Sequence, residues 1–146
     1  MNNTIAIVPA RSGNWKNILQ LLSERNLMTS DLTAERDFLV AIQDDELVGC
    51  GCLERHDSWG FVRSVAVASP WERCGIGRRL VNKLILRAKA ENLRGLYLLT
   101  LDAQHFFRSV GFAEVARQSV PEAIQQTDQF ITSCPQSATV MFYGLE

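Results

Sequence analysis

Long apolar runs and an excess of charge are both missing from this sequence of 146 residues. No stretch of about eighteen apolar residues occurs, so we predict no membrane-spanning helix. The N-terminus, MNNTIAIVPARSG, has neither the basic start nor the long apolar core of a signal peptide, and we therefore expect a cytoplasmic protein. The chain has 15 basic and 16 acidic residues and a formal net charge of -1. This balance gives no overall positive charge that would attract a nucleic acid or an anionic membrane surface.

Cysteine is scarce, with four residues, and in the cytoplasm these would be reduced thiols rather than a disulfide framework. They are Cys50, Cys52, Cys74 and Cys134. Cys50 and Cys52 would project from one face of a strand, which raises the question of trivalent arsenic or a metal ion. Two thiols without a histidine are too few for a structural zinc site, and buried cysteines commonly act as small apolar side chains. We expect no metal.

The most informative stretch is Ser64–Leu80, SVAVASPWERCGIGRRL. Its first part is typical of a buried strand, which Pro70 ends because proline cannot donate to a ladder. Gly75 and Gly77 would allow the backbone to approach a ligand, and a helix begins near Gly77. Unpaired N–H groups and the helix dipole make such a helix start an anion site. The stretch therefore predicts a loop that holds phosphate or pyrophosphate, the alternative being a strand–turn–helix without a ligand.

Periodicity and turn residues predict the remaining elements. In order they are strand 5–8, a helix from Trp15, hairpin arms 38–42 and 47–55, strand 61–68, helix 77–90, strand 96–100, helix 103–110, a strand from 112 to 117, helix 120–132 and strand 139–145. Strands in a meander ahead of the phosphate loop differ from the Rossmann order. No repeat or linker is visible, so we predict one mixed α/β domain over residues 1–146.

Two motifs resemble the GCN5-related N-acetyltransferase (GNAT) superfamily. ERCGIGRRL is similar to its Gln/Arg-x-x-Gly-x-Gly loop, and HFFRSVGF resembles the Phe-Tyr-x-x-x-Gly-Phe end of its domains. The tail RQSVPEAIQQTDQFITSCPQSATVM is similar to small acetyltransferases associated with arsenic-resistance operons, and more loosely to the catalytic domain of N-acetylglutamate synthases. The likeness runs from about residue 47 to residue 141.

The resemblance implies a central, mostly antiparallel mixed sheet flanked by helices, with a splayed parallel strand pair at an acetyl-CoA site. The strand would hold the pantetheine arm, and the loop amides would hold the pyrophosphate. The implied acetyl-CoA-binding residues are Val65, Ala66, Val67, Arg73, Cys74, Gly75, Ile76, Gly77, Arg78 and Phe107.

Two positions depart from the family pattern. Glu72 stands where Gln or Arg is usual, so either its carboxylate turns outward or affinity for the cofactor is weakened. Arg73, Arg78 and Arg79 could offset its charge. Phe107 stands where a tyrosine often protonates the leaving thiolate, so water or another donor would have to serve.

Acetyl transfer to an amine needs a proton acceptor, and Glu54 is our first candidate, with a solvated carboxylate at a strand end as the alternative. Asp102 is second, although a loop cap suits it better. His105 lies beside the expected thiol and could relay a proton, the alternative being a surface histidine. His56 lies in a turn and is a weaker candidate.

Arg63 lies in an otherwise apolar strand and needs a partner. It either pairs with a structural carboxylate or binds a substrate carboxylate, which would favour an amino-acid-like acceptor. Arg11 and Arg117 are weaker candidates of the same kind.

The sequence thus predicts an N-acetyltransferase that moves an acetyl group from acetyl-CoA to the primary amine of a small molecule by direct attack in a ternary complex. An amino acid or its analogue, including an arsenic-containing one, is the favoured acceptor. The alternatives are a protein or peptide amine, or a non-catalytic CoA-binding sensor module. The last strand could help to form a homodimer.

Overall fold

The computed structural model describes residues 4–33, 36–127, 130–131 and 138–146. Its strands and α-helices are β1 (Ala6–Pro9), α1 (Trp15–Glu24), β2 (Asp37–Gln43), β3 (Glu46–His56), β4 (Trp59–Val67), α2 (Ile76–Ala90), β5 (Gly95–Thr100), α3 (Gln104–Val110), β6 (Ala113–Glu114), α4 (Glu122–Gln125) and β7 (Thr139–Gly144). Three short 3-10 helices are η1 (Ser12–Asn14), η2 (Ser69–Trp71) and η3 (Arg117–Ser119). No helix among these described residues is long and apolar enough to cross a membrane.

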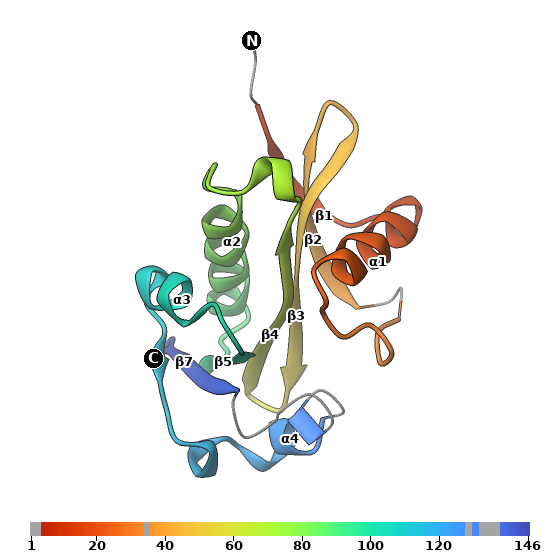
Figure 1. Ribbon diagram of the computed structural model, residues 1–146. Coiled ribbons are helices and arrows are strands. Elements are labelled where there is room, and N and C mark those ends of the chain that lie inside the picture. The colour runs from red at the N-terminus through yellow and green to blue at the C-terminus, as the bar shows by residue number, and fades with distance from the viewer. Residues whose placement is uncertain (1–3, 34–35, 128–129, 132–137) are drawn as a thin grey trace. The chain divides into compact units, whose positions relative to one another are not determined.

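The strands form one seven-stranded sheet in the order β1-β2-β3-β4-β5-β7-β6 (Figure 1). β4 and β5 are parallel where Gly60 faces Leu96 and Phe61 faces Tyr97. β5 then pairs with β7 in the antiparallel sense over its whole length, as β1 does with β2 and β2 with β3. The mixed, mostly antiparallel sheet with one parallel pair confirms the predicted fold class.

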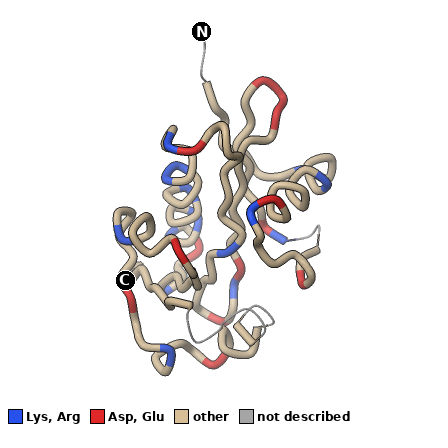
Figure 2. Tube along the Cα trace, viewed as in Figure 1, with Lys and Arg blue, Asp and Glu red and all other residues tan. Residues whose placement is uncertain are grey.

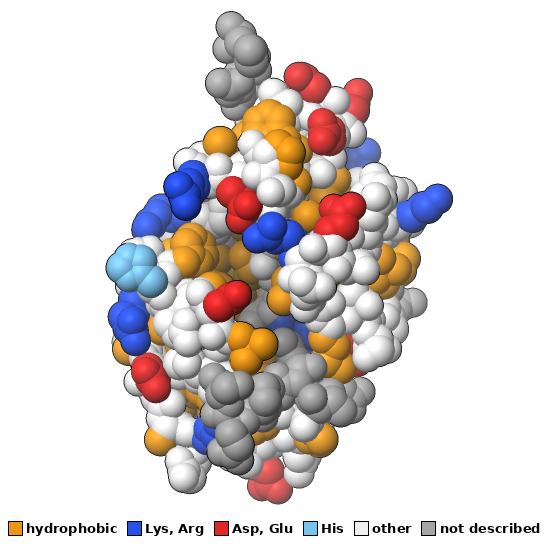
Figure 3. All heavy atoms as spheres, in the orientation of Figure 1, with side chains coloured by type: hydrophobic (Ala, Val, Ile, Leu, Met, Phe, Trp, Pro, Cys, Tyr) orange, Lys and Arg blue, Asp and Glu red, His pale blue; other side chains and the backbone are white. Residues whose placement is uncertain are grey.

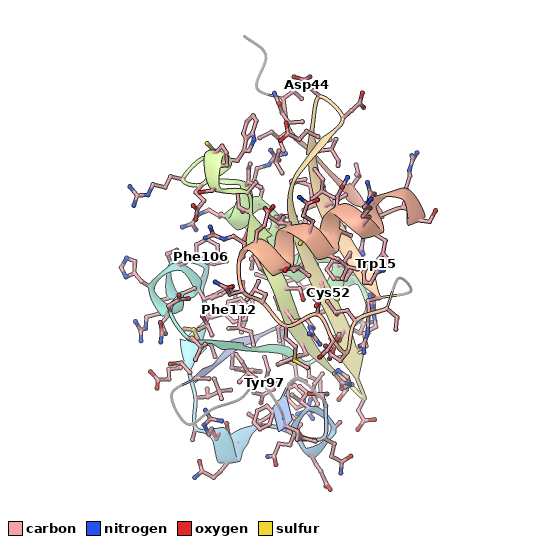
Figure 4. The ribbon with its side chains drawn as sticks, turned by 45° about the vertical axis from the view of Figure 1, so that its right-hand side comes forward. Trp15, Asp44, Cys52, Tyr97, Phe106 and Phe112 are labelled. Carbon is pink, nitrogen blue, oxygen red and sulfur yellow. The ribbon has the colours of Figure 1, made fainter. Side chains whose placement is uncertain are left out.

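The described chain divides into two compact units, of which the first contains Met1–Leu53 and Ser64–Leu84. On one side of β3, α1 packs against a buried cluster that includes Phe38, Cys50 and Cys52 (Figure 4). On the other side α2 comes so close that a Cβ added at Gly49 would lie 3.1 Å from side-chain atoms of both Ile76 and Leu80. Small residues on this face of β3 therefore allow α2 to lie close to the strand (Figure 1).

The second unit contains Glu54–Arg63 and Ile85–Glu146. Its buried cluster is Phe61, Tyr97, Val120, Ile124 and Val140, with Trp59 and Phe142 packed against it. Tyr97 and Phe142 face each other across β5 and β7 with ring centroids 4.7 Å apart. This unit carries α3, which is capped at its C-terminal end by Gly111 with a φ of 121°.

Two predictions for the C-terminal part were wrong in their boundaries. The strand expected from 112 to 117 is limited to β6, because the Ser119 hydroxyl and amide both bond to the Ala116 carbonyl and close a 3-10 turn. Of the helix expected over 120–132, residues 128–129 and 132 lie outside the described residues, and α4 ends at Gln125, two residues before Thr127, whose hydroxyl donates to the Ile124 carbonyl and accepts from the Phe130 amide. Such side-chain bonds compete with a continuous helix.

Candidate functional site

The strand that leads into the predicted phosphate loop is irregular. Ser64 in β4 is buried, and its φ of 59° places a non-glycine residue in the left-handed region. The Cys50 thiol donates to the Ser64 carbonyl at 3.4 Å and thereby helps to hold this conformation. A left-handed residue inside a strand interrupts the regular alternation of side chains and backbone groups. The N–H and C=O groups of the residues that follow Ser64 therefore do not continue the regular hydrogen-bonding pattern of a strand.

The loop between β4 and α2 contains two residues with left-handed backbone conformations. Arg73 and Gly75 have φ values of 65° and 83°. The first turn of α2 follows at once, since the Arg79 amide bonds to the Gly75 carbonyl at 3.1 Å. Left-handed residues among right-handed ones arrange successive N–H groups into a concave nest, and a helix start adds further donors. We call residues 72–77 the cofactor loop, after the role that the sequence motif predicts for them.

No side chain crowds Gly75, where an added Cβ would meet nothing within 4 Å. The glycine therefore serves backbone conformation, because a side chain at a φ of 83° would be strained. Arg73, Cys74 and Gly75 are exposed, whereas Ile76 is buried and anchors the start of α2. The loop consequently presents its backbone on a fixed helix end.

Glu72, the acidic departure from the family pattern, is turned toward α1. Its Oε2 lies 2.9 Å from Nη2 of Arg25, the residue that caps the C-terminal end of α1. Its other oxygen, Oε1, accepts from the Ser69 hydroxyl at 3.5 Å. Of the arginines named as compensation, Arg79 donates instead to the Ile5 carbonyl at 2.8 Å. The acidic and basic residues that follow one another in this loop are visible along the trace (Figure 2).

Glu54 and Arg63, predicted separately as base and substrate ligand, form a buried ion pair. Arg63 Nη1 lies 3.2 Å from Glu54 Oε2, and the two side chains are 1% and 4% exposed, respectively. His56 Nε2 lies 3.0 Å from the other carboxylate oxygen. Glu54 is therefore not a solvated carboxylate, and Arg63 has a carboxylate partner within the protein. The three side chains form one polar network at the β3–β4 end of the second unit.

α3 carries His105 on its exposed side and Phe107 on its buried side. The Phe107 ring lies edge-on to both Phe106 and Phe112, with centroid distances of 5.0 and 5.7 Å. Asp102 is exposed, and Thr100 Oγ1 accepts from the Ala103 amide just ahead of α3. Phe107 therefore has a clear packing role besides the cofactor contact that the motif implies.

The remaining sequence candidates have local roles. Arg117 donates to the Ala138 carbonyl at 2.8 Å, and the Arg11 amide donates to Asn14 Oδ1 at 2.8 Å. Cys50 and Cys52 are buried free thiols, and burial raises the pKa of Cys50 to about 12. Cys74 is an exposed free thiol, and Cys134 lies outside the described residues. Within the described ranges, no group of three or more His, Cys, Asp or Glu side chains gathers to hold a metal ion.

Two residues of this site were missed in the sequence. Arg25 is 47 positions from Glu72 and carried no local signal beyond its place at a helix end. Ser64 carries only a weak signal, because a small polar residue within an apolar strand is not enough to predict an irregularity.

Comparisons with known proteins agree with this architecture. An uncharacterised N-acetyltransferase of Chlorobaculum tepidum is 31% identical over 68% of this chain and 63% of its own length. An amino-acid acetyltransferase of Mycobacterium tuberculosis is 32% identical over 78% of this chain and 66% of its own length. The chain thus spans about two thirds of the length of these relatives.

The solved structure of N-acetylglutamate synthase from Neisseria gonorrhoeae, complexed with coenzyme A and N-acetyl-glutamate, shares the fold. It superimposes with a TM-score of 0.85 at 20% identity and covers 100% of this chain and 36% of that one. The family described as the acetyltransferase (GNAT) family matches residues 10–112, and this chain belongs to that family.

Proposed function

We propose that this protein transfers an acetyl group from acetyl-CoA to the primary amine of a small molecule, most favourably an amino acid or an amino-acid analogue. The observation that carries the proposal is the cofactor loop, in which Arg73 and Gly75 adopt left-handed conformations directly ahead of α2. The acceptor class rests on the relative named an amino-acid acetyltransferase and on the arginine in β4.

Acetyl-CoA fits the residues present. A concave run of amides at a helix start suits a pyrophosphate, and the donors of the cofactor loop would hold it there. The implied loop ligands are Arg73, Cys74, Gly75, Ile76, Gly77 and Arg78. In β4, Val65 and Val67 are half-buried and Ala66 is buried, which suits a strand that holds the pantetheine arm.

The reaction forms a C–N bond and breaks the C–S bond of the thioester, and its charge balance fixes what the protein must supply. A β4 amide near Val67 would donate to the thioester oxygen, where negative charge develops. Glu54 would take the proton of the attacking ammonium, directly or through water. His56, 3.0 Å from its carboxylate, extends that network outward. The nitrogen loses a second proton once the C–N bond has formed, and this proton would pass to the leaving thiolate through water or His105.

Arg63 remains our proposed ligand for an acceptor carboxylate. A guanidinium carries five N–H donors, so its ion pair with Glu54 does not by itself exclude a second acceptor. The arrangement suggests a shared role, in which one buried network would hold both the base and the carboxylate ligand. Because its ion pair holds the arginine in one conformation, the arginine would favour acceptors whose carboxylate lies at a fixed distance from the reacting amine.

The test is coenzyme A binding by calorimetry, followed by thiol release from acetyl-CoA with a panel of acceptors. The panel contains amino acids, arsonic and phosphinic amino-acid analogues, polyamines and peptides. We expect turnover with the amino-acid class, with an arsenic-containing analogue as one candidate within it. Turnover with peptides alone would overturn the acceptor class, and absence of coenzyme A binding would overturn the proposal itself.

A CoA-binding sensor is the second candidate, because one observation favours it. Phe107 is buried among aromatic rings and has no hydroxyl where the family motif places a tyrosine. A sensor would bind coenzyme A without turnover of any amine. Phe107→Tyr should then leave the protein inactive, whereas an enzyme that uses water as the acid would keep its activity.

The exposed thiol of Cys74 offers a direct test of the cofactor loop. In a Cys134→Ser background, a disulfide reagent should label Cys74 rapidly and leave the buried Cys50 and Cys52 unlabelled in the native protein. Saturating coenzyme A should slow the labelling of Cys74 at least tenfold, because the bound phosphates would cover the loop. Unchanged labelling would place the coenzyme elsewhere.

A further inference from the structure

The cofactor loop contains a negative charge, the carboxylate of Glu72, which should repel the pyrophosphate that we propose the loop binds. Like charges within a Debye length, about 8 Å at physiological salt, repel each other appreciably. Glu72 is the first residue of the cofactor loop, three residues before Gly75. A carboxylate free to turn toward the loop would therefore weaken the binding of an anion there.

The structure shows what keeps that carboxylate in place. Glu72 Oε2 contacts Arg25 Nη2 at 2.9 Å, and Oε1 accepts from the Ser69 hydroxyl. Arg25 is itself well anchored, because its amide closes the last turn of α1 on the carbonyls of Leu21, Leu22 and Ser23. The Glu72 amide bonds to the Ser69 carbonyl, which fixes the backbone from which the side chain extends.

One of the other arginines near the cofactor loop has a different partner. Arg79 is directed to the Ile5 carbonyl. Arg73 is exposed within the loop itself. On the face drawn in Figure 3 basic and acidic side chains are interspersed, so the local partner of Glu72 matters more than any field of the whole surface.

We propose that Arg25 is a positioning residue for coenzyme binding, which holds the Glu72 carboxylate on α1 and so keeps the cofactor loop receptive to the pyrophosphate. The inference rests on the proposed function, since it assigns the pyrophosphate of acetyl-CoA to this loop. Through the exposed ion pair between Arg25 and Glu72, α1 would then contribute indirectly to coenzyme binding.

The central experiment is a double-mutant cycle read by calorimetry with coenzyme A. Arg25→Ala should raise Kd for coenzyme A about three- to tenfold, because it releases a partly exposed charge near the bound anion. Glu72→Gln should bind as tightly as the wild-type protein or more tightly. The double variant should have the same Kd for coenzyme A as Glu72→Gln, because Arg25 has no carboxylate to hold once Glu72 is replaced.

Three controls separate positioning from general damage. Lys16→Ala removes an exposed cation from the same helix and should leave Kd unchanged. Arg25→Lys should restore much of the affinity. The rescue of Arg25→Ala by Glu72→Gln excludes misfolding as the cause, since a second substitution in the loop would not repair an unfolded α1.

The ligand series places the effect on the coenzyme. Dephospho-coenzyme A keeps the pyrophosphate and should show the same fold-loss with Arg25→Ala. Pantetheine lacks the pyrophosphate, and its binding, followed by ligand-observed NMR, should be unaffected. A loss seen with coenzyme A but absent with dephospho-coenzyme A would place the effect at the 3′-phosphate and overturn the inference.

Kinetics provide an independent reading once an acceptor is found. Arg25→Ala should raise KM for acetyl-CoA in proportion to Kd and leave kcat unchanged, as expected when ground-state binding alone is lost. If the wild-type protein binds coenzyme A and Arg25→Ala binds it equally well, the inference is wrong and the proposed function stands. If the wild-type protein binds no coenzyme A, the proposed function fails and the inference falls with it.

Discussion

Strands β3 and β4 contain the buried ion pair Glu54–Arg63 and the buried thiol of Cys50, whereas the cofactor loop contributes Glu72 to an exposed ion pair and carries the exposed thiol of Cys74. The Glu54–Arg63 pair is 4% and 1% exposed, whereas the Glu72–Arg25 pair is 44% and 39% exposed. Cys50 in β3 is buried, and Cys74 in the loop is exposed. The same chemical groups therefore have different consequences in the two places.

Burial decides what each pair can do. A buried ion pair is expensive to break, because removal of one partner leaves the other charge in a poorly solvated place. An exposed pair contributes little to folding, because water and salt screen it. The buried pair thus contributes to the stability of the fold in addition to its proposed part in the reaction, whereas the exposed pair contributes little to folding.

The largest expected effect comes from breaking the buried pair. Arg63→Met should lower the free energy of unfolding by about 3–5 kcal/mol, because it leaves Glu54 without its guanidinium partner. Chemical denaturation measures the change, and Arg108→Met, at an exposed pair 3.7 Å from Glu114, is the matched control with an expected loss below about 1 kcal/mol. Glu54→Leu combined with Arg63→Met should regain much of the loss. Equal losses in Arg63→Met and Arg108→Met would contradict the distinction between the regions.

A medium effect is expected from the buried thiol at high pH. Burial raises the pKa of Cys50 from 9.0 to about 12, so above pH 9 the unfolded chain loses this proton while the folded chain keeps it. The unfolded state then binds fewer protons, and stability falls as pH rises from about 9 to about 12.

Comparison of variants isolates this contribution from other titrating groups. The difference in unfolding free energy between the wild-type protein and Cys50→Ala should shrink by about 1.4 kcal/mol between pH 8 and pH 10. Cys74→Ala, at the exposed thiol, should show no such change relative to the wild-type protein. A pH-independent difference for Cys50→Ala would mean that its thiol ionises as easily in the folded protein as in the unfolded chain.

The smallest effect on folding is expected at the loop pair. Arg25→Ala should lower the free energy of unfolding by less than about 1 kcal/mol, because water already screens an exposed ion pair. In 0.5 M salt the screening length falls to about 4–5 Å, so most of that difference should disappear. Thermal or denaturant unfolding at two salt concentrations measures it, with Lys16→Ala as the control. A loss as large as that of Arg63→Met would show that Arg25 stabilises the fold and would weaken its assignment to coenzyme binding.

Local patterns in the sequence were sufficient for most of the fold. The spacing of Ile18 and Leu22 marked α1, Asp44 and Asp45 marked the hairpin turn, and Pro70 and Gly75 bounded the loop before α2. These features depend on a few neighbouring residues, because side-chain periodicity and allowed φ values are local properties. The helix expected from Val120 failed for the same reason, since the hydroxyl bonds of Thr127 compete with helix bonds in a way that periodicity does not record.

The sequence by itself determined the order of the elements, the cofactor-loop motif and the resemblance to the family. It also identified Glu54, Arg63 and Glu72 as residues that need an explanation. Only the tertiary structure decided their partners, because packing brings Arg25 to Glu72 across 47 positions and turns Arg63 onto Glu54 across 9. A charged side chain reveals its type in the sequence, but its effect depends on which charge lies beside it and on how much water surrounds them both.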